Sequence, residues 1–281
     1  MSIFEKIYNV LNYEIQTPVN YGAFHIVSLI LIAAATFILC KLFLGCDEKT
    51  ERKIALYFWI TVISLELYKQ YNYTLSYEDG KAVWDYAWYI FPFQFCSSPF
   101  YVLPFIAFSK NERLREAAAA FMGTFSLFAG IAVCLYPTDI YIETLGIDIQ
   151  TTVHHGSQVV LGFFFALRRF TAENTPKIKK YFLSATAIFS SLVLLAIILD
   201  FSFYHILQAN GIDETFNMFF ISPYFDCSLP LLSSIQYLVP YPVVLLVYVF
   251  GFSAAAAIAM GVTVLISKAV KKASSASADK A

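Results

Sequence analysis

Long, uninterrupted apolar runs are the feature that most limits what this chain can fold into. About 20 apolar residues suffice to cross a bilayer as a helix, and several runs in this chain of 281 residues reach that length. Charged residues make up only 14% of the sequence, against about a quarter in a soluble domain. The runs are continuous and do not alternate with a period of two, as strands of a membrane barrel would. We therefore predict an all-α, multi-pass protein of the cell membrane.

The apolar runs and the polar segments between them predict seven helices in a single domain, residues 1–271. The predicted spans are 22–45, 53–75, 86–108, 114–136, 147–169, 180–207 and 240–267. Residues 209–239 form a longer outer loop, which is apolar in places and interrupted by prolines. This loop either lies in the membrane interface or dips back into the protein as a re-entrant segment. The small, polar tail 272–281 is predicted to be disordered.

Lysine and arginine indicate the orientation, because cytoplasmic loops of membrane proteins carry an excess of both. With the amino terminus outside, nearly all of the 19 lysines and arginines fall in cytoplasmic segments. The exceptions are Lys6, Lys69 and Lys81. We therefore predict an external amino terminus and a cytoplasmic carboxyl terminus.

Several functional classes lack their sequence signatures here. The sequence has no Walker motif, no GxGxxG loop and no HExxH, so nucleotide-driven transport within this chain is not expected. No signal peptide is recognisable in the first 20 residues. The five cysteines form no CxxC pair and no zinc pattern; they are Cys40, Cys46, Cys96, Cys134 and Cys227. We predict no metal, no cofactor and no nucleic-acid partner, and we expect membrane lipids as partners.

Most polar residues inside the predicted spans fall in the outer half of the membrane. Ionisable groups are costly in hydrocarbon and usually face the bundle interior, so their shared depth predicts a polar chamber that opens outward. Simpler interpretations stay open: Glu66 can pair with Lys69 three residues later, and Asp200 can be a solvated helix end. His25 and His205 are interpreted as interfacial. The candidates for the chamber are Glu66, Gln94, Cys96, His154, His155, Gln158 and Asp200.

The segment FPFQFCSSPFYVLP, residues 91–104, places Cys96 among three prolines. The prolines are expected to bend the third helix and to open space beside the sulfur. His154 and His155 are adjacent on the fifth helix, and their 100° separation allows at most one of them to face a given partner directly. An imidazole beside a thiol can take its proton and make it a nucleophile. Cysteine is also common in membrane helices as a small apolar residue, so catalysis and ordinary packing both stay open at this point.

Two segments add a family resemblance that covers residues 20–267. FPFQFCSSPFYVLP resembles the "LPLHLC" helix of the bacterial YwaF-type integral membrane proteins. NMFFISPYFDCSLPLLSSIQYLVPYPVVLLVY, which begins at Asn217, resembles the asparagine-containing loop and the last helix of the same family. The histidines of TTVHHGS match a histidine on helix five. One departure is Gln94, which stands where the family motif has histidine.

The resemblance implies a function as well as a fold. The family is similar to the vertebrate transmembrane acyltransferase that moves fatty acyl chains onto lysophospholipids through a cysteine and a histidine. It is more distantly similar to the androgen-induced hydrolases of fatty-acid esters. By this resemblance Cys96 is the acyl-accepting nucleophile, His154 or His155 is its base, and Asn217 binds or orients the substrate.

The sequence therefore predicts a lipid acyltransferase or lipid-ester hydrolase. Hydrogen bonds to the oxyanion are expected from the side chains of Gln94, Ser97, Ser98 or Asn217. Two alternatives stay open: a non-enzymatic transporter or ligand-binding membrane protein with an outward-facing chamber, and a protein with a purely structural role. The expected substrate-binding residues are Gln94, Ser97, Asn217, Gln158, Asp200 and Glu66.

Overall fold

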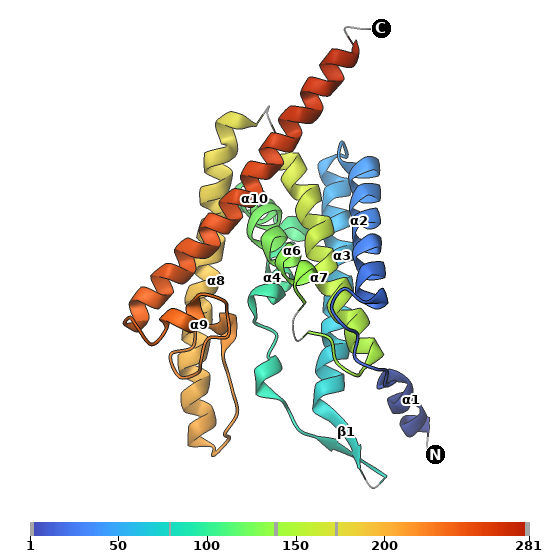
Figure 1. The fold of residues 1–281 in the computed structure, drawn as a ribbon, viewed down its shortest axis with the longest axis vertical. Coiled ribbons are helices and arrows are strands. Elements are labelled where there is room, and N and C mark those ends of the chain that lie inside the picture. Colours follow the sequence, from blue (N-terminus) through green and yellow to red (C-terminus); the bar gives the residue numbers. More distant parts are fainter. Residues whose placement is uncertain (1–2, 79, 138–139, 172–173, 279–281) are drawn as a thin grey trace.

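Helices follow one long axis of the molecule and leave the two termini at opposite ends of it, as Figure 1 shows for the computed structural model. The structure describes residues 3–78, 80–137, 140–171 and 174–278. The helices are α1 (Ile3–Leu11), α2 (Ala23–Phe43), α3 (Glu48–Thr74), α4 (Ser98–Phe108), α5 (Glu112–Phe121), α6 (Leu127–Leu135), α7 (Leu145–Arg169), α8 (Thr175–Ala209), α9 (Leu232–Ile235) and α10 (Tyr241–Ala278). A π-helical turn, Met122–Ser126, joins α5 to α6.

Local signals explain where several helices begin. The Asp47 side chain accepts a hydrogen bond from the backbone N–H of Thr50 and caps α3. Asn111 caps α5 in the same way, through the N–H groups of Arg113 and Leu114. Such side chains satisfy N–H donors that the first turn of a helix leaves unpaired.

Among the described residues, four helices and not seven are long and apolar enough to cross a membrane. They are α2, the continuous rod Glu112–Leu135, α8 and α10. Four such helices indicate a multi-pass membrane protein. The segments expected at 53–75 and 147–169 are helical, as α3 and α7, but both carry many polar residues. The prediction of seven apolar spans therefore exceeds what length and composition support.

The third predicted span, 86–108, differs most from expectation. Its first half is irregular and contains two short 3-10 turns, Trp88–Ile90 and Phe95–Ser97. The helix α4 begins at Ser98. Proline lacks the N–H that a helix interior requires but suits the first turn. Accordingly, Pro92 lies before the helix and Pro99 lies in its first turn, so these two prolines limit the helix and do not bend it. Pro104 lies inside α4.

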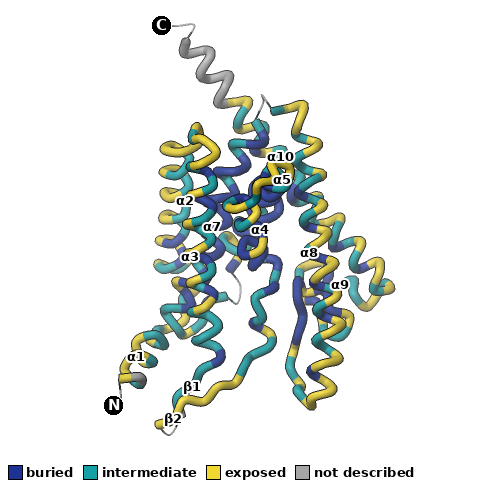
Figure 2. Tube along the Cα trace, turned by 180° about the vertical axis from the view of Figure 1, so that it is seen from behind, coloured by how far each residue is buried: buried dark blue, intermediate teal, exposed yellow. Residues whose placement is uncertain are grey.

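The core lies around α7, which is the most buried of the long helices, while α2, α8 and α10 keep exposed outer faces (Figure 2). Glycines allow α6 and α7 to approach closely. A Cβ atom at Gly130 would lie 2.7 Å from the Cβ of Gln158, and one at Gly162 would lie 2.6 Å from the Cβ of Leu127. Stacked rings fill the centre of the core, with Phe125 and Phe189 at a centroid distance of 4.5 Å.

The long loop 209–239 folds back against the bundle. Phe219 is buried, and its ring lies 5.6 Å from that of Phe93 and 5.7 Å from that of Phe95. Two further features are absent from the sequence prediction: helix α1, and an antiparallel hairpin of β1 (Leu75–Glu78) and β2 (Lys81–Trp84). The tail 272–281 is predicted to be disordered, but residues 272–278 belong to α10. Residues 279–281 lie outside the described residues.

Candidate functional site

Cys96 lies in the 3-10 turn Phe95–Ser97, immediately before α4. The carbonyl oxygen accepts hydrogen bonds from two side chains of α7: Nε2 of His154 at 2.9 Å and Nε2 of Gln158 at 2.6 Å. The thiol itself is free and half-buried. These bonds attach the cysteine turn directly to the polar stripe of α7.

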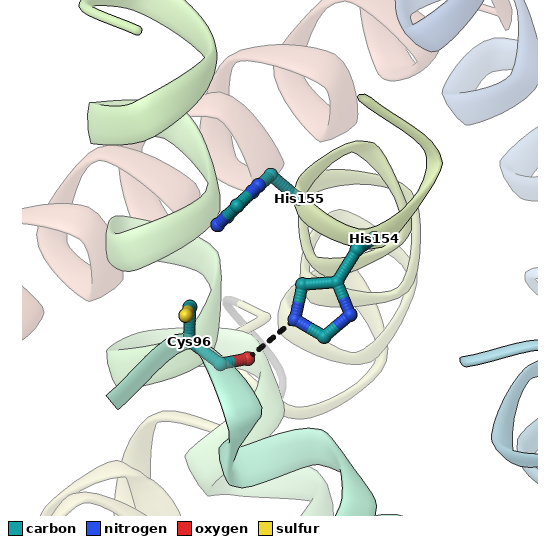
Figure 3. A group of neighbouring side chains, drawn as sticks. All are labelled: Cys96, His154 and His155. Atoms are coloured by element: carbon teal, nitrogen blue, oxygen red, sulfur yellow. Dashed lines mark hydrogen bonds between the residues drawn. The ribbon is translucent and has the colours of Figure 1, made fainter. Parts of the chain in front are cut away.

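Both histidines lie close to Cys96, and His154 is the one that bonds to its main chain. The sulfur of Cys96 and one ring nitrogen of each histidine lie within 4.8 Å of one another. Figure 3 shows why: the ring of His154 approaches the cysteine carbonyl, while the outer end of the His155 ring is directed toward the side of the sulfur. The two rings meet edge to face, at 5.1 Å between centroids.

Backbone carbonyls define the tautomer of each histidine. Nδ1 of His155 lies 2.8 Å from the carbonyl oxygen of Thr151. Because a carbonyl can only accept, Nδ1 carries the proton and Nε2 of His155 is an unprotonated base. The same argument gives His154 a protonated Nε2 toward Cys96 and a bare Nδ1. That Nδ1 is buried without a hydrogen-bond partner in the part of the chain that the structure describes.

A cysteine with two histidines is also a ligand set that zinc accepts, so the tautomers decide what this cluster offers. Protonated nitrogens do not coordinate metals, and Nε2 of His154 is occupied by its bond to the Cys96 carbonyl. The cluster then supplies two ligands, the sulfur and Nε2 of His155, where a structural zinc site uses four and a catalytic one three. As arranged, the residues fit a thiol with a base better than a metal centre.

Gln94 and Asn217 stabilise the loop 209–239. The amide of Gln94 donates to the carbonyl oxygen of Asn217 at 2.9 Å and accepts from the N–H of Phe219 at 2.9 Å. The side chain of Asn217 accepts from the N–H of Ser222 and donates to the carbonyl of Asp226.

Asp200 supports the same loop from α8. It is fully buried, and its Oδ1 accepts from the N–H of Met218 at 2.7 Å. The interpretation of Asp200 as a solvated helix end is therefore wrong. Phe219 and Phe220 both have positive φ angles, 56° and 59°, a conformation that non-glycine residues adopt only when neighbours fix it.

Ser97 and Ser98 are both buried beside the thiol. The hydroxyl of Ser98 has no hydrogen-bond partner among the described residues. Since the side chains of Gln94 and Asn217 are hydrogen-bonded to the loop, Ser98 is the candidate oxyanion donor whose hydroxyl is available for a new hydrogen bond. The positive end of the α4 dipole also favours negative charge at this place.

A cavity of about 460 Å³ opens beside the site. Gln94, Asn217 and Thr151 contribute to its wall, together with Lys69 from α3. Lys69 forms the expected ion pair with Glu66, at 3.0 Å. We refer to this cavity as the outer cavity, because it lies toward the helix ends that are predicted to be external.

An apolar groove of about 660 Å³ runs between α2, α6 and α7. Val159, Phe163 and Leu167 form its wall on α7, and Val159 lies one helical turn after His155. The outer cavity and this groove thus offer a polar and an apolar space on the two sides of the histidines.

The structure brings seven of the predicted residues together as one connected site: Gln94, Cys96, Ser97, His154, His155, Gln158 and Asn217. Asp200 lies behind the loop, and Glu66 is paired with Lys69 of the cavity wall but does not line the cavity itself. Of the two interfacial histidines, His205 is exposed, but His25 is buried and bonded to the carbonyl of Cys134. Sequence reasoning missed Lys69 as a wall residue. A lysine inside an apolar span was the available signal.

The chain matches no protein-family model, and comparisons with curated proteins and with solved structures find no match either.

Proposed function

We propose that the chain is a membrane enzyme of the YwaF type, which transfers an acyl group from, or hydrolyses, a lipid ester. The observation that carries this proposal is the free thiol of Cys96 within 4.8 Å of imidazole nitrogens, at a buried place between a polar cavity and an apolar groove. A reactive thiol needs a base within reach of its proton, and a lipid substrate needs room for both a polar head and a chain.

The proposal includes seven membrane crossings, with the amino terminus outside. α3 has 27 residues and α7 has 25, so each is about 37–40 Å long and can cross the hydrocarbon layer. Their low hydropathy comes from polar residues that are largely buried inside the bundle, such as Glu66, Gln150 and His154. The remaining crossing consists of α4 and the irregular chain before it, which protein covers.

The reaction follows from the tautomers. Nε2 of His155 takes the proton of the Cys96 thiol, and the thiolate attacks the carbonyl carbon of the acyl ester. The bond from carbon to the alkoxide oxygen breaks, the imidazolium returns its proton to the leaving alcohol, and a thioester remains on Cys96. An acceptor alcohol, or water, then gives its proton to Nε2 and attacks the thioester, which releases the acyl product and restores the thiol.

Lipid mass spectrometry of cells tests this function. We expect the wild type to change the ratio of lysophospholipid to phospholipid, or the level of free fatty acid, and Cys96→Ala and His155→Gln to lose that effect. Cys46→Ala is the matched control, since it removes another thiol, which lies beside Arg168 and lines neither the groove nor the outer cavity. Identical lipid profiles in the wild type and Cys96→Ala would overturn the proposal.

The outer cavity by itself also favours a second candidate, a non-enzymatic protein that binds or transports a small solute. This candidate predicts solute binding or uptake that survives Cys96→Ala and fails when the cavity wall is changed. The first candidate predicts the reverse dependence, so the same set of variants separates the two.

A further inference from the structure

Lys69 is the one described cation in the wall of the outer cavity. It lies in the last third of α3, inside a predicted span, where a charged side chain is costly unless it has a function or a partner. The remaining wall is a mixture of aromatic, aliphatic, amide and hydroxyl side chains with one carboxylate, Asp226. A cavity of this kind fits a small anionic group attached to a larger, less polar molecule.

The neighbours of Lys69 fix its position without using up its hydrogen bonds. Glu66 is buried, with 8% of its side chain exposed, and it also accepts a hydrogen bond from Gln70 at 2.7 Å. The amide of Gln70 in turn donates to the carbonyl of Ile90 at 3.0 Å. An ammonium group has three donors, and the bond to Glu66 takes one of them. The side chain of Lys69 keeps 22% of its surface exposed.

The outer cavity adjoins the thiol site through two residues of its wall, Gln94 and Thr151. Gln94 lies two residues before Cys96, and the carbonyl of Thr151 accepts a hydrogen bond from Nδ1 of His155. A group bound at Lys69 would therefore lie in a cavity whose wall includes the residues next to the thiol and its base.

We propose that Lys69 binds the phosphate of a lipid headgroup and so orients the neighbouring acyl ester toward Cys96. The assignment rests on the function proposed above, and it adds the residue that selects a phosphate-bearing substrate over a neutral one. Lysine binds phosphate as a point charge. At the headgroup level of a bilayer, phosphate is the anion linked to glycerol esters, and the apolar groove on α7 remains for the chain.

The test measures binding in a Cys96→Ala background, so that no chemistry interferes. The probes are lysophosphatidylglycerol and monoacylglycerol with the same photoreactive chain, which differ by the phosphate headgroup. We expect Lys69→Gln to weaken crosslinking of the phospholipid probe by about tenfold or more, as loss of a charge-assisted hydrogen bond implies. Crosslinking of monoacylglycerol should be unchanged.

Three further variants separate anion binding from damage to the fold. Glu66→Gln keeps the cation and should bind the phospholipid probe at least as well as the parent. The double variant Glu66→Gln/Lys69→Gln leaves no buried charge unpaired and should lose binding like Lys69→Gln. Lys81→Gln, at an exposed outer lysine of β2, should have no effect.

Several outcomes would overturn the proposal: equal losses for both probes, no loss for either, or equal losses in Glu66→Gln and Lys69→Gln. Displacement of the phospholipid probe by inorganic phosphate at millimolar concentration would assign the site to free phosphate and overturn the lipid assignment. The lipid profiles of the wild type and Cys96→Ala report on the enzyme function separately, so the two proposals can fail independently.

Discussion

Two backbone carbonyl oxygens decide which histidine can act as a base. The Thr151 carbonyl holds the proton of His155 on Nδ1, and the Cys96 carbonyl holds that of His154 on Nε2. The histidines are adjacent in sequence, yet one presents a lone pair toward the thiol and the other presents a donor to the main chain. A base and a positioning residue are thus distinguished by their partners.

We expect His155→Gln to lose most of the reactivity of Cys96, because general bases contribute about 10²–10⁴-fold. His154→Gln should retain a larger share, since a glutamine amide can still donate to the Cys96 carbonyl. The measurement is the rate of Cys96 alkylation between pH 6 and pH 9 in a chain whose other four cysteines are replaced. His205→Gln, at the exposed histidine, is the control. Equal rate losses in the two α7 variants would contradict the assignment.

Gln94 shows where sequence reasoning reached its limit at this scale. Its depth and its place in the cysteine motif were readable, and the prediction made it a substrate-binding residue. Its observed partners lie in a loop more than 120 residues later in the chain. No local sequence pattern around Gln94 predicts these partners. An amide side chain that both donates to and accepts from the main chain needs the folded loop to be identified.

At the scale of elements, α6 and α7 approach closely at the level of the site. A Cβ atom on Gly130 would lie 2.7 Å from the Cβ of Gln158 and 2.9 Å from the carbonyl oxygen of His155. Ordinary contacts are longer, so the two helices must separate if this glycine is replaced. Such a separation would also move Gln158 and His155 away from Cys96.

Gly130→Ala is therefore expected to reduce the free energy of unfolding by about 1–3 kcal/mol, as overpacking typically does. We expect a lower melting temperature and slower alkylation of Cys96. The control is Gly261→Ala in α10, where nothing lies within 4 Å of the added atom. There alanine should be neutral or stabilising, because it favours helix over glycine. Similar melting curves for both variants, measured by scanning fluorimetry in detergent, would argue against close helix packing at Gly130.

The elements most visible in the sequence were those with long apolar runs, such as α2, α8 and α10. The sequence predicts a helix over residues 86–97 because the apolar residues there give no period that would indicate otherwise, and it predicts that Pro92 bends this helix. In the structure, extended chain and 3-10 turns carry these residues, and Phe93 and Phe95 contact Phe219 of the loop 209–239. The sequence does not predict how that loop lies, since packing against the bundle is a tertiary property.

At the scale of the whole molecule, charged groups gather at the end opposite to the outer cavity. Glu51, in the first turn of α3 and before the predicted span, pairs with Arg168 at 2.6 Å and with both terminal nitrogens of Arg169 at 2.6 and 2.8 Å. Arg169 also pairs with Glu116 of α5 at 3.0 Å. This cluster ties α3, α5 and α7 together, and sequence reasoning, which noted only the terminal cations, did not foresee it.

The cluster predicts a pH dependence of stability. Burial by itself raises the pKa of Glu51, but the hydrogen bonds and charges of Arg169 and Arg168 outweigh it and hold the pKa below the usual 4.5. A carboxylate with a lowered pKa stabilises the fold above its usual pKa and loses that contribution as the pH falls through the folded value. The difference in melting temperature between wild type and Glu51→Gln should therefore be constant from pH 7 to pH 5 and shrink below pH 4.5. Glu48→Gln, at an exposed carboxylate, is the control, and a difference that grows on acidification would contradict the linkage.

Orientation can be tested on the whole chain. A reporter that is active only outside the cytoplasm should be inactive when fused after residue 281 and active when inserted into the hairpin turn at Gly80. The strand β1 and the carboxyl terminus lie at opposite ends of the long axis (Figure 1). Activity at both positions, or at the carboxyl terminus alone, would refute the predicted topology and with it the external position of the cavity.

The ion-pair cluster joins α3, α5 and α7 at the end predicted to be cytoplasmic, while the outer cavity lies at the other end. Under the proposed function, a lipid would therefore enter and leave through the same half of the bundle. In an acyl transfer, the acyl group would then pass from one lipid to another without any molecule crossing the bilayer. Such a transfer would change the composition of one leaflet and leave the number of lipids in each leaflet as it was.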